Sequence, residues 1–228
     1  MSLAGWCDAV VFDFDGTIAD SESVEHQSWQ RIWSDHGHVL ELDDWLLCVG
    51  TRGGWDPVSG LEARLGRGVD RRSLIDDHHE FCVAAHAGLG PRDGVLDWLD
   101  EAVEAGVKVG LASSADHAYL ERSLVRLGIR QHFLAVVGYD DVGAAKPDPA
   151  TYVEACRLLA VAPQSALAIE DSPHGVAAAA GAGLRCVACP GPITAGMDFG
   201  AADLRIPSFV ACLLTDVASA IGRGHPIA

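Results

Sequence analysis

Residues 9–17, Ala-Val-Val-Phe-Asp-Phe-Asp-Gly-Thr, decide the fold class. The stretch begins with consecutive apolar residues, which are typical of a strand that is covered on both faces in a parallel sheet. It ends at Asp15-Gly16, where glycine allows the backbone to turn. Asp13 and Asp15 lie two residues apart, and two carboxylates so close do not both ionise cheaply without a cation beside them. A turn or a helix cap explains one of these acids but not the second at the end of a buried strand.

Helices and strands alternate beyond residue 91, whereas residues 22–90 contain helical patterns only. Strands that are separated by helices of about ten residues imply right-handed crossovers and a mostly parallel sheet with helices on both faces. The expected strands are 9–14, 107–112, 135–137, 166–169 and 185–188, and the expected helices are 24–33, 43–49, 57–65, 71–87, 93–104, 118–127, 150–159, 175–182 and 209–221. We therefore expect an α/β fold with a Rossmann-like parallel sheet and an inserted helical segment.

Polar side chains follow four of these strands. In open α/β sheets, ligands bind beyond the carboxyl ends of the strands. The residues at these ends are Asp13 and Asp15, then Ser113 and Ser114, then Lys146, and finally Glu170-Asp171. The sequence therefore predicts that carboxylates, hydroxyls and one ammonium group meet at one edge of the sheet.

The chemistry of this set favours a metal and a phosphate. Oxygen ligands such as Glu170 and Asp171 favour Mg²⁺, which takes substrate phosphate as a further ligand. An isolated lysine in such a loop is ordinarily a surface residue, but beside four carboxylates Lys146 would offset their charge and hold a phosphoryl group. Ser113 suits a phosphate oxygen, or else it only caps the helix that follows.

Composition and charge limit the partners. The chain has 228 residues, 49% of them hydrophobic, a mean hydropathy of +0.18 and a formal net charge of −16. This charge disfavours nucleic acid, and a small anionic substrate needs a metal ion or positive groups that reverse the field locally. No apolar run reaches the roughly 18 residues of a membrane span, and residues 1–8 lack the pattern of a secretory signal. We expect no nucleic acid and no membrane as partners.

The cysteines and histidines do not predict a second metal site. Seven scattered cysteines, an odd number, indicate reduced thiols and a cytoplasmic protein. Cys186 and Cys189 have C-x-x-C spacing, but no second pair or histidine cluster completes a zinc site there. Asp-Asp-His-His-Glu (76–80) is interpreted as a solvated helical face, because consecutive residues point around a helix instead of converging.

These residues resemble the motifs of the haloacid dehalogenase (HAD) superfamily of phosphotransferases. All four family motifs stand in order, at 13–17, Ser113, Lys146 and Glu170-Asp171. The flanking sequences Leu-Ala-Ser-Ser, Lys-Pro-Asp-Pro and Glu-Asp-Ser-Pro-His-Gly are similar to the β-phosphoglucomutase-like and phosphoglycolate-phosphatase-like branch. The resemblance spans nearly the whole chain. It implies a Rossmann-like catalytic core of residues 1–20 and 91–228 and an α-helical cap domain of residues 21–90.

The resemblance also implies a role for each polar residue. Asp13 would be the nucleophile that becomes an aspartyl-phosphate, and Asp15 the general acid and then the base that activates water. Mg²⁺ would be held by Asp13, by the main-chain carbonyl of Asp15 and by Asp171, with Glu170 in the inner shell or just behind it. Lys146 and the metal would neutralise charge on the phosphoryl oxygens. The residues implied to contact the phosphate are Thr17, Ser113 and Ser114. True dehalogenases lack an acid at the place of Asp15, so dehalogenation is not expected.

The helical insert and the core supply candidates for substrate recognition. The sequence Gly-Thr-Arg-Gly-Gly (50–54) resembles a cap loop that offers an arginine to the anionic part of the substrate, so Arg52 is the best candidate, against the alternative of an exposed loop arginine. His117 stands where the family often places a polar phosphate or sugar contact. Sugar-phosphate mutases carry a histidine ten residues after the second aspartate. That position is Glu25 here, and His26 comes one residue later, which counts against a mutase.

The sequence thus predicts a Mg²⁺-dependent phosphatase that hydrolyses a small phosphomonoester, a sugar or polyol phosphate, through an aspartyl-phosphate. The alternative is a β-phosphoglucomutase-type sugar phosphate mutase, which would need a bisphosphate to prime Asp13 and would release little phosphate. A regulatory protein on an inactive phosphatase scaffold is disfavoured by the intact set of Asp13, Asp15, Lys146 and Asp171. The sequence does not name the substrate or the oligomeric state.

Overall fold

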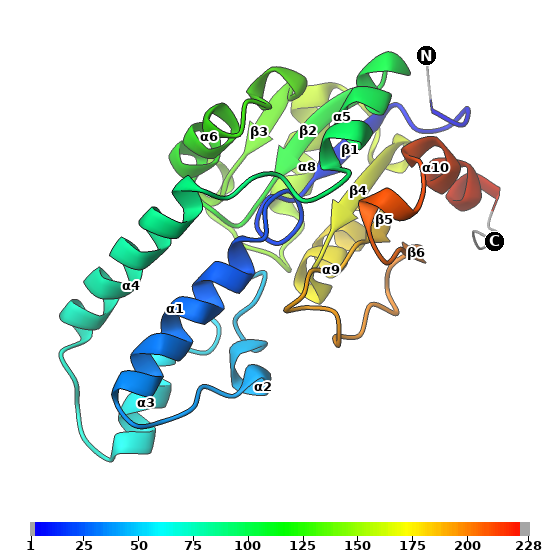
Figure 1. Cartoon of the computed structure of the whole chain (residues 1–228). Coiled ribbons are helices and arrows are strands. Elements are labelled where there is room, and N and C mark those ends of the chain that lie inside the picture. Colours follow the sequence, from blue (N-terminus) through cyan, green and yellow to red (C-terminus); the bar gives the residue numbers. More distant parts are fainter. Residues whose placement is uncertain (1–2, 224–228) are drawn as a thin grey trace.

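The computed structural model describes residues 3–223 and confirms the α/β fold (Figure 1). Six strands form one sheet in the order β3-β2-β1-β4-β5-β6, and every neighbouring pair is parallel. β1 lies between β2 and β4, so the chain that follows β1 leaves the sheet near the middle of its carboxyl edge. The strands are β1 (Ala9–Phe12), β2 (Lys108–Ala112), β3 (Ala135–Val137), β4 (Ala166–Glu170), β5 (Arg185–Ala188) and β6 (Leu204–Arg205).

Helices cover both faces of the sheet, because successive residues of a strand point to opposite sides. Val10 and Phe12 of β1 belong to the apolar core on one face, and Ala9 and Val11 belong to the core on the other. The helices on the first face are α5 (Val95–Glu104), α6 (His117–Arg126) and α10 (Leu214–Arg223), and those on the second are α8 (Ala150–Leu159) and α9 (Pro173–Ala182). The all-apolar strands predicted from the sequence are therefore buried on both sides.

Four helices between β1 and α5 extend away from the sheet (Figure 1). They have an apolar core of their own, in which Trp33 and Leu61 are fully buried. The Asp20 carboxylate caps the first helix by accepting from the backbone N–H of Ser23 at 3.4 Å. The helices are α1 (Ser21–Asp35), α2 (Leu42–Trp45), α3 (Pro57–Leu65) and α4 (Arg71–Ala87). The exact limits of a cap domain at residues 21 and 90 stay a prediction.

The structure differs from the sequence-based expectation at the periphery. The helix expected over 209–221 is interrupted: Phe209–Ala211 forms a 3-10 turn, and α10 begins only at Leu214. The cause is tertiary, because the Trp98 indole donates to the carbonyl oxygen of Phe209 at 3.1 Å and the Glu101 carboxylate accepts from the N–H of Leu214 at 2.8 Å. The elements that were not expected are α7 (Tyr139–Val142), β6, and short 3-10 turns at Arg130–His132 and Pro163–Ser165.

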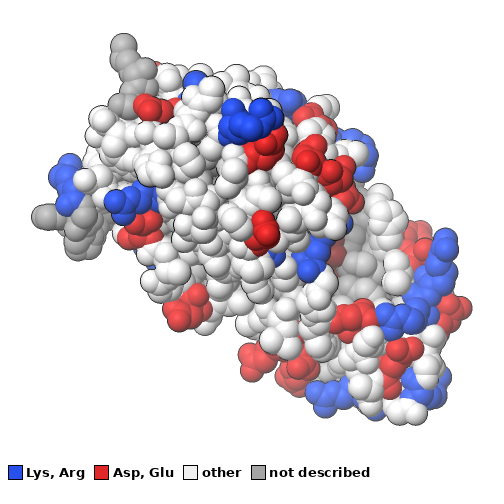
Figure 2. Space-filling model, turned by 180° about the vertical axis from the view of Figure 1, so that it is seen from behind, with Lys and Arg blue, Asp and Glu red and all other residues white. Residues whose placement is uncertain are grey.

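The surface carries charges of both signs. On the face seen in Figure 2, Lys and Arg side chains (blue) lie next to Asp and Glu side chains (red). Among the described residues, no helix is long and apolar enough to cross a lipid bilayer.

Candidate active site

Three carboxylates converge at the carboxyl edge of the sheet. Asp13 follows β1, and Glu170 and Asp171 stand at the end of β4, the strand paired with β1. The backbone N–H of Asp13 donates to the carbonyl oxygen of Ile169 at 2.9 Å, so the ladder between the two strands continues up to the site. Each of the three acids offers a carboxylate oxygen within 4.8 Å of those of the other two. The structure therefore brings these predicted acids together.

Lys146 lies inside this cluster and not at the surface. Its ammonium pairs with Asp13 Oδ1 and, at 2.6 Å, with Glu170 Oε1, and its side chain is 2% exposed. The loop that carries it is held from the neighbouring strand end, because the backbone N–H of Lys146 donates to Ser114 Oγ at 3.1 Å. One ammonium group thus stands against two buried carboxylates.

Both carboxylate oxygens of Glu170 accept hydrogen bonds from the protein. Besides Lys146, its Oε1 accepts from the Tyr152 hydroxyl at 2.6 Å, and its Oε2 accepts from Ser172 Oγ at 3.4 Å. A side chain at Gly175, in the first turn of α9, would overlap this carboxylate, so glycine is needed for the close approach. Glu170 is consequently fixed as a partner of Lys146.

Burial makes the negative charge of the cluster costly. It raises the pKa of Asp13 to about 7, although Lys146 acts in the opposite direction. It also raises the pKa of Asp171 well above its ordinary value, and the charges of Asp13 and Glu170 add to that effect. Burial lowers the pKa of Lys146, but the adjoining carboxylates outweigh this and raise it above the usual range. The site therefore carries more negative charge than one ammonium group compensates.

The residues present fit a hard divalent cation. The donors are carboxylate oxygens, which suit Mg²⁺, and a dication would neutralise the excess charge of Asp13 and Asp171. Gly16 has φ +82°, and a side chain there would overlap the Asp171 carboxylate. The turn that follows Asp13 thus lies directly against Asp171. The fit of the donor set supports the predicted cofactor.

Asp15 is held separately from these acids. Its Oδ1 accepts from Ser21 Oγ at 2.7 Å and from the Tyr119 hydroxyl at 3.1 Å. Burial raises its pKa, and the hydrogen bonds from Ser21 and Tyr119 oppose that shift. A carboxyl group with a raised pKa and a fixed orientation is suited to donate a proton to a leaving group.

A cavity of about 860 Å³ lies above these acids. Asp13 and Asp15 line it from the sheet, and Ser113 and Ser114 line it from the end of β2. Residues of the helical insert form the opposite side, among them Glu22, Glu25, Arg52 and His86. The space lies between core and insert, and its volume suits a small organic molecule.

The residues predicted to bind substrate divide into two groups. Ser113, Ser114 and Arg52 line the cavity, and Arg52 also donates to the carbonyl oxygen of Ser114 at 2.6 Å and pairs with Asp116 at 2.8 Å. Thr17 and His117 are absent from the described residues that line it. Thr17 is fully buried, and the described part of the chain offers its hydroxyl no hydrogen-bond partner.

His117 is occupied elsewhere. Its Nδ1 lies 2.7 Å from Asp141 Oδ2, and its Nε2 lies 3.6 Å from Glu121. The sequence could not distinguish this face of α6 from the cavity face, which carries Tyr119 instead.

Comparison with known proteins identifies the family. The family model described as haloacid dehalogenase-like hydrolase matches residues 10–189. The chain belongs to the haloacid dehalogenase-like hydrolases. The putative phosphatase YhcW of Bacillus subtilis (strain 168) is 36% identical over 200 residues, which are 88% of this chain and 91% of that protein.

Further relatives place the chain in the branch predicted from its motifs. Validoxylamine A 7'-phosphate phosphatase of Streptomyces hygroscopicus subsp. limoneus is 33% identical over 187 residues, 78% of this chain and 83% of that protein. A mutant CbbY from Rhodobacter sphaeroides, solved in complex with xylulose-1,5-bisphosphate, has a TM-score of 0.71 and 28% identity over 89% of this chain and 95% of that one. This haloacid dehalogenase-like hydrolase is a phosphoric monoester hydrolase of the β-phosphoglucomutase and phosphatase branch.

The loop between α2 and α3 of this hydrolase lies against the core. Thr51 Oγ1 donates to the carbonyl oxygen of Lys146 at 2.5 Å, and His174 Nδ1 lies 2.9 Å from the carbonyl oxygen of Val49. Between them, Gly50 has φ +74°, and a side chain there would overlap Ser172 Oγ. The insert thus contacts the core directly over the acidic cluster.

Gly50→Ala is therefore expected to impair closure of this loop over the core. The methyl group would collide with Ser172, so the loop should shift outward and kcat/KM for a phosphomonoester should fall. Gly53→Ala is the matched control, since Gly53 has a similar φ of +76° but no atom near its absent side chain. Both variants carry the same backbone strain of about 1–2 kcal/mol. Equal kcat/KM values for the two variants would contradict the idea that contact with Ser172 matters.

Sequence reasoning missed three residues at the site. Ser21 and Tyr119 hold Asp15, and Glu22 lines the cavity with a pKa that burial, Asp15 and Glu25 raise to about 8. Ser21 and Glu22 precede the helix expected over 24–33 and belong to none of the motifs, whereas in the structure they form the first turn of α1. Tyr119 lies in the first turn of α6, two residues after His117. This offset places the two side chains on different faces of the helix.

Proposed function

We propose that the protein is a Mg²⁺-dependent phosphatase that hydrolyses a small phosphomonoester, a sugar or polyol phosphate, through an aspartyl-phosphate. The observation that carries the proposal is the convergence of Asp13, Lys146, Glu170 and Asp171, because Asp13 also lines a cavity whose opposite side is formed by the helical insert. Clustered carboxylates of this kind are suited to bind a cation, which in turn binds a phosphate group.

The proposed reaction takes place in two displacements on phosphorus. In the first, a carboxylate oxygen of Asp13 forms a bond to phosphorus, the bond to the substrate oxygen breaks, and Asp15 gives its proton to that oxygen. In the second, Asp15 takes a proton from water, whose oxygen attacks phosphorus and releases Asp13 as carboxylate. The two hydrogen bonds from Ser21 and Tyr119 orient Asp15 for both proton transfers.

Mg²⁺ would be held by the carboxylates of Asp13 and Asp171 and by the main-chain carbonyl of Asp15. It would supply positive charge to the phosphoryl oxygens. Lys146 adds an ammonium group beside Asp13, and we place Glu170 behind the inner ligands, because Lys146, Tyr152 and Ser172 occupy its oxygens. Ser113 and Ser114 are proposed as phosphate contacts, whereas the predicted contact from Thr17 is not supported, because Thr17 is fully buried and does not line the cavity.

The helical insert would act as a cap of residues 21–90 that selects the substrate. Arg52 lies in the cavity wall over the core and is the proposed contact to an anionic part of the substrate. The relatives support a small phosphorylated metabolite, since one is a validoxylamine phosphate phosphatase and another was solved with xylulose-1,5-bisphosphate. A cytoplasmic location, where such metabolites occur, is part of the proposal.

A phosphate-release screen tests the proposal. Purified protein is incubated with a panel of sugar, polyol and other phosphomonoesters, with Mg²⁺ and with a chelator in its place. We expect stoichiometric phosphate from at least one sugar or polyol phosphate with Mg²⁺, and none with the chelator. Isomerised sugar phosphate without phosphate release, and only after addition of a bisphosphate, would favour the mutase instead. Phosphate release that is unchanged by the chelator would refute the metal requirement.

Tyr119→Phe is expected to move the alkaline limb of the pH profile of kcat/KM to higher pH. The Tyr119 hydroxyl stabilises the charged form of Asp15, so its loss raises the pKa of Asp15 further. Asp15 must be protonated for the first displacement, and a higher pKa keeps it protonated to higher pH. Tyr139→Phe is the control, because the Tyr139 ring stacks with Arg52 and phenylalanine keeps that ring. A limb that stays in place or moves to lower pH would argue against Asp15 as the acid.

A further inference from the structure

A second group of metal-ligating side chains lies in the helical insert, apart from the acidic cluster. His78, Cys82 and His86 follow one another at intervals of four residues along α4, which places them on one face of the helix. That face meets α1, which contributes Glu25. The four residues offer one oxygen, one sulfur and two nitrogen donors from two packed helices.

The distances between the donors of Glu25, His78 and Cys82 suit a common ion, and His86 lies beside them. His78 Nε2 lies 2.8 Å from Glu25 Oε2, and His86 Nε2 lies 4.0 Å from Glu25 Oε1. Cys82 Sγ lies 3.9 Å from His78 Nε2. Donor atoms of Glu25, His78 and Cys82 all lie within 4.8 Å of one another. Ligands at about 2.0–2.3 Å from one tetrahedral ion are separated by comparable distances.

The surroundings of His78 fix the orientation that a metal ligand requires. Its Nδ1 lies 3.0 Å from the hydroxyl of Ser28, which is fully buried, and its ring stacks on Trp29 with the centroids 4.5 Å apart. A ligating histidine typically donates its other N–H to such an outer partner, which fixes the ring and the tautomer. Nε2 is thereby directed at Glu25.

His86 supplies an independent indication. Its Nε2 is buried and has no hydrogen-bond partner among the described residues, although a buried polar atom ordinarily has one. Glu25 Oε1 lies 4.0 Å from this nitrogen, which is beyond hydrogen-bond range. Glu25, Cys82 and His86 also line the cavity, so an ion has a path to the site.

We propose that Glu25, His78 and Cys82 bind one divalent transition-metal ion, of the class of Zn²⁺, which joins α1 to α4, with His86 beside the site. The sulfur and nitrogen donors select such an ion over Mg²⁺, because thiolate and imidazole are poor ligands for a hard cation. Binding forms bonds from the ion to Cys82 Sγ, to His78 Nε2 and to one carboxylate oxygen of Glu25, and the Cys82 thiol proton passes to solvent. The site shares no residue with Asp13, Glu170 and Asp171.

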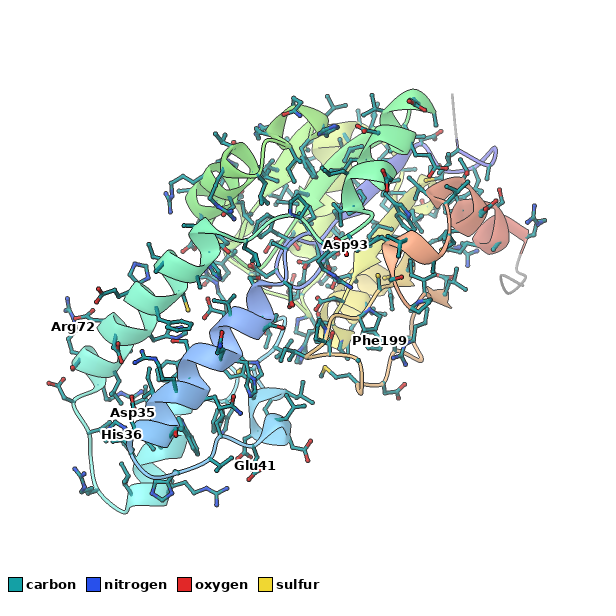
Figure 3. The ribbon with its side chains drawn as sticks, in the orientation of Figure 1. Asp35, His36, Glu41, Arg72, Asp93 and Phe199 are labelled. Atoms are coloured by element: carbon teal, nitrogen blue, oxygen red, sulfur yellow. The ribbon has the colours of Figure 1, made fainter. Side chains whose placement is uncertain are left out.

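The exposed acids beside His78 explain why the sequence did not reveal this site. Asp76 pairs with Arg72, which points away from α1 in Figure 3, and Asp77 pairs with Arg31 of α1. The solvated-face interpretation of residues 76–80 thus fits these acids, but His78 turns inward. The pattern that indicates the site is the four-residue spacing of His78, Cys82 and His86. Their partner on α1, Glu25, lies more than fifty residues earlier in the chain.

Titration with Co²⁺ tests the proposal, because a cobalt–thiolate bond gives a charge-transfer absorption that carboxylate ligands do not give. We expect the full-length wild-type protein to develop this band up to one Co²⁺ per chain, and Zn²⁺ to abolish it. Cys82→Ser should lose the band, whereas Cys156→Ser, the matched change of another buried thiol, should keep it. Asp13→Asn should also keep it, since the acidic cluster is a different site.

A second variant tests the site without removing a ligand. Ser28→Ala should weaken Co²⁺ binding by about 10–100-fold, the usual effect of losing an outer partner, while the band keeps its shape. Zn²⁺ should raise the Tm of the wild-type protein and not that of Cys82→Ser. The proposal is overturned if the wild-type protein gives no band, if Cys82→Ser retains it, if Cys156→Ser or Asp13→Asn abolishes it, or if Ser28→Ala binds Co²⁺ as tightly as wild type.

Discussion

Asp13→Asn is expected to lower Mg²⁺-dependent phosphate release by at least about a thousandfold, the scale on which loss of a nucleophile acts in other covalent enzymes. Asparagine has the shape of aspartate but offers no carboxylate oxygen to phosphorus. The protein should remain folded, because the substitution removes a negative charge from a buried cluster in which burial raises the pKa of Asp13 to about 7. Initial rates of phosphate release from the best substrate of the screen measure the effect.

The matched control for this variant is Asp93→Asn. Asp93, labelled in Figure 3, is exposed in the segment before α5, and it does not belong to the cluster of Asp13, Glu170 and Asp171. The same change of charge there should leave the rate at the wild-type value, and circular dichroism should show the same helix content in all three proteins. A folded Asp13→Asn protein that retains wild-type rates would show that another group attacks phosphorus.

Lys146→Met is expected to destabilise the protein more than any of the other substitutions, and to abolish activity as well. The Lys146 ammonium is the cation that contacts both Asp13 and Glu170, and each of these side chains is less than 10% exposed. Removing one partner of a buried ion pair leaves uncompensated charge and costs about 3–5 kcal/mol of the free energy of unfolding. Denaturant unfolding at about pH 7.5 measures this loss.

The destabilisation should shrink as the pH falls. Without Lys146, the pKa of Asp13 in the folded protein rises beyond its value of about 7, while in the unfolded chain it stays near the ordinary 3.8. Between about pH 7 and this higher pKa, the folded variant binds a proton that the folded wild-type protein does not bind, so the difference between their free energies of unfolding shrinks as the pH is lowered through that range. A penalty that is independent of pH would contradict buried, uncompensated carboxylates as the cause.

Lys108→Met is the matched control for this substitution. Lys108 stands at the start of β2, where its ammonium donates to the carbonyl oxygen of Leu159 at 2.6 Å and meets no carboxylate among the described residues. Its loss should cost about 1 kcal/mol, the usual value for one hydrogen bond, and should leave activity intact. If both variants lost equal amounts of the free energy of unfolding and of activity, there would be no basis for assigning Lys146 to the site.

Local sequence patterns were sufficient for the sheet and its flanking helices. The limits of α3, α4, α8, β3 and β5 agree with the prediction, because apolar periodicity, proline at the first turn and glycine after the last are local signals. The C-terminal segment could not be predicted in this way. Its helix begins at Leu214 because Glu101, which lies more than a hundred residues earlier, caps it.

The acidic cluster was predictable because the carboxyl ends of parallel strands lie at the same edge of the sheet. Once β1 and β4 are parallel neighbours, Asp13 and Asp171 must emerge at the same edge, whatever the side chains around them do. The contact between Tyr119 and Asp15 could not be predicted in this way. Tyr119 and His117 both lie in the first turn of the same helix and differ only in the face of the helix on which they lie.

By itself, the sequence determined the α/β fold, the family and the set of polar residues at the sheet edge, because each depends on the order of residues within one strand, one turn or one helix. Only the tertiary structure decided which oxygens of Glu170 are occupied, which side of α6 faces the cavity, and that Glu25 meets His78 and Cys82. These contacts depend on how α1, α4 and α6 are rotated and packed against one another, and that rotation is fixed by burial of residues far apart in the chain.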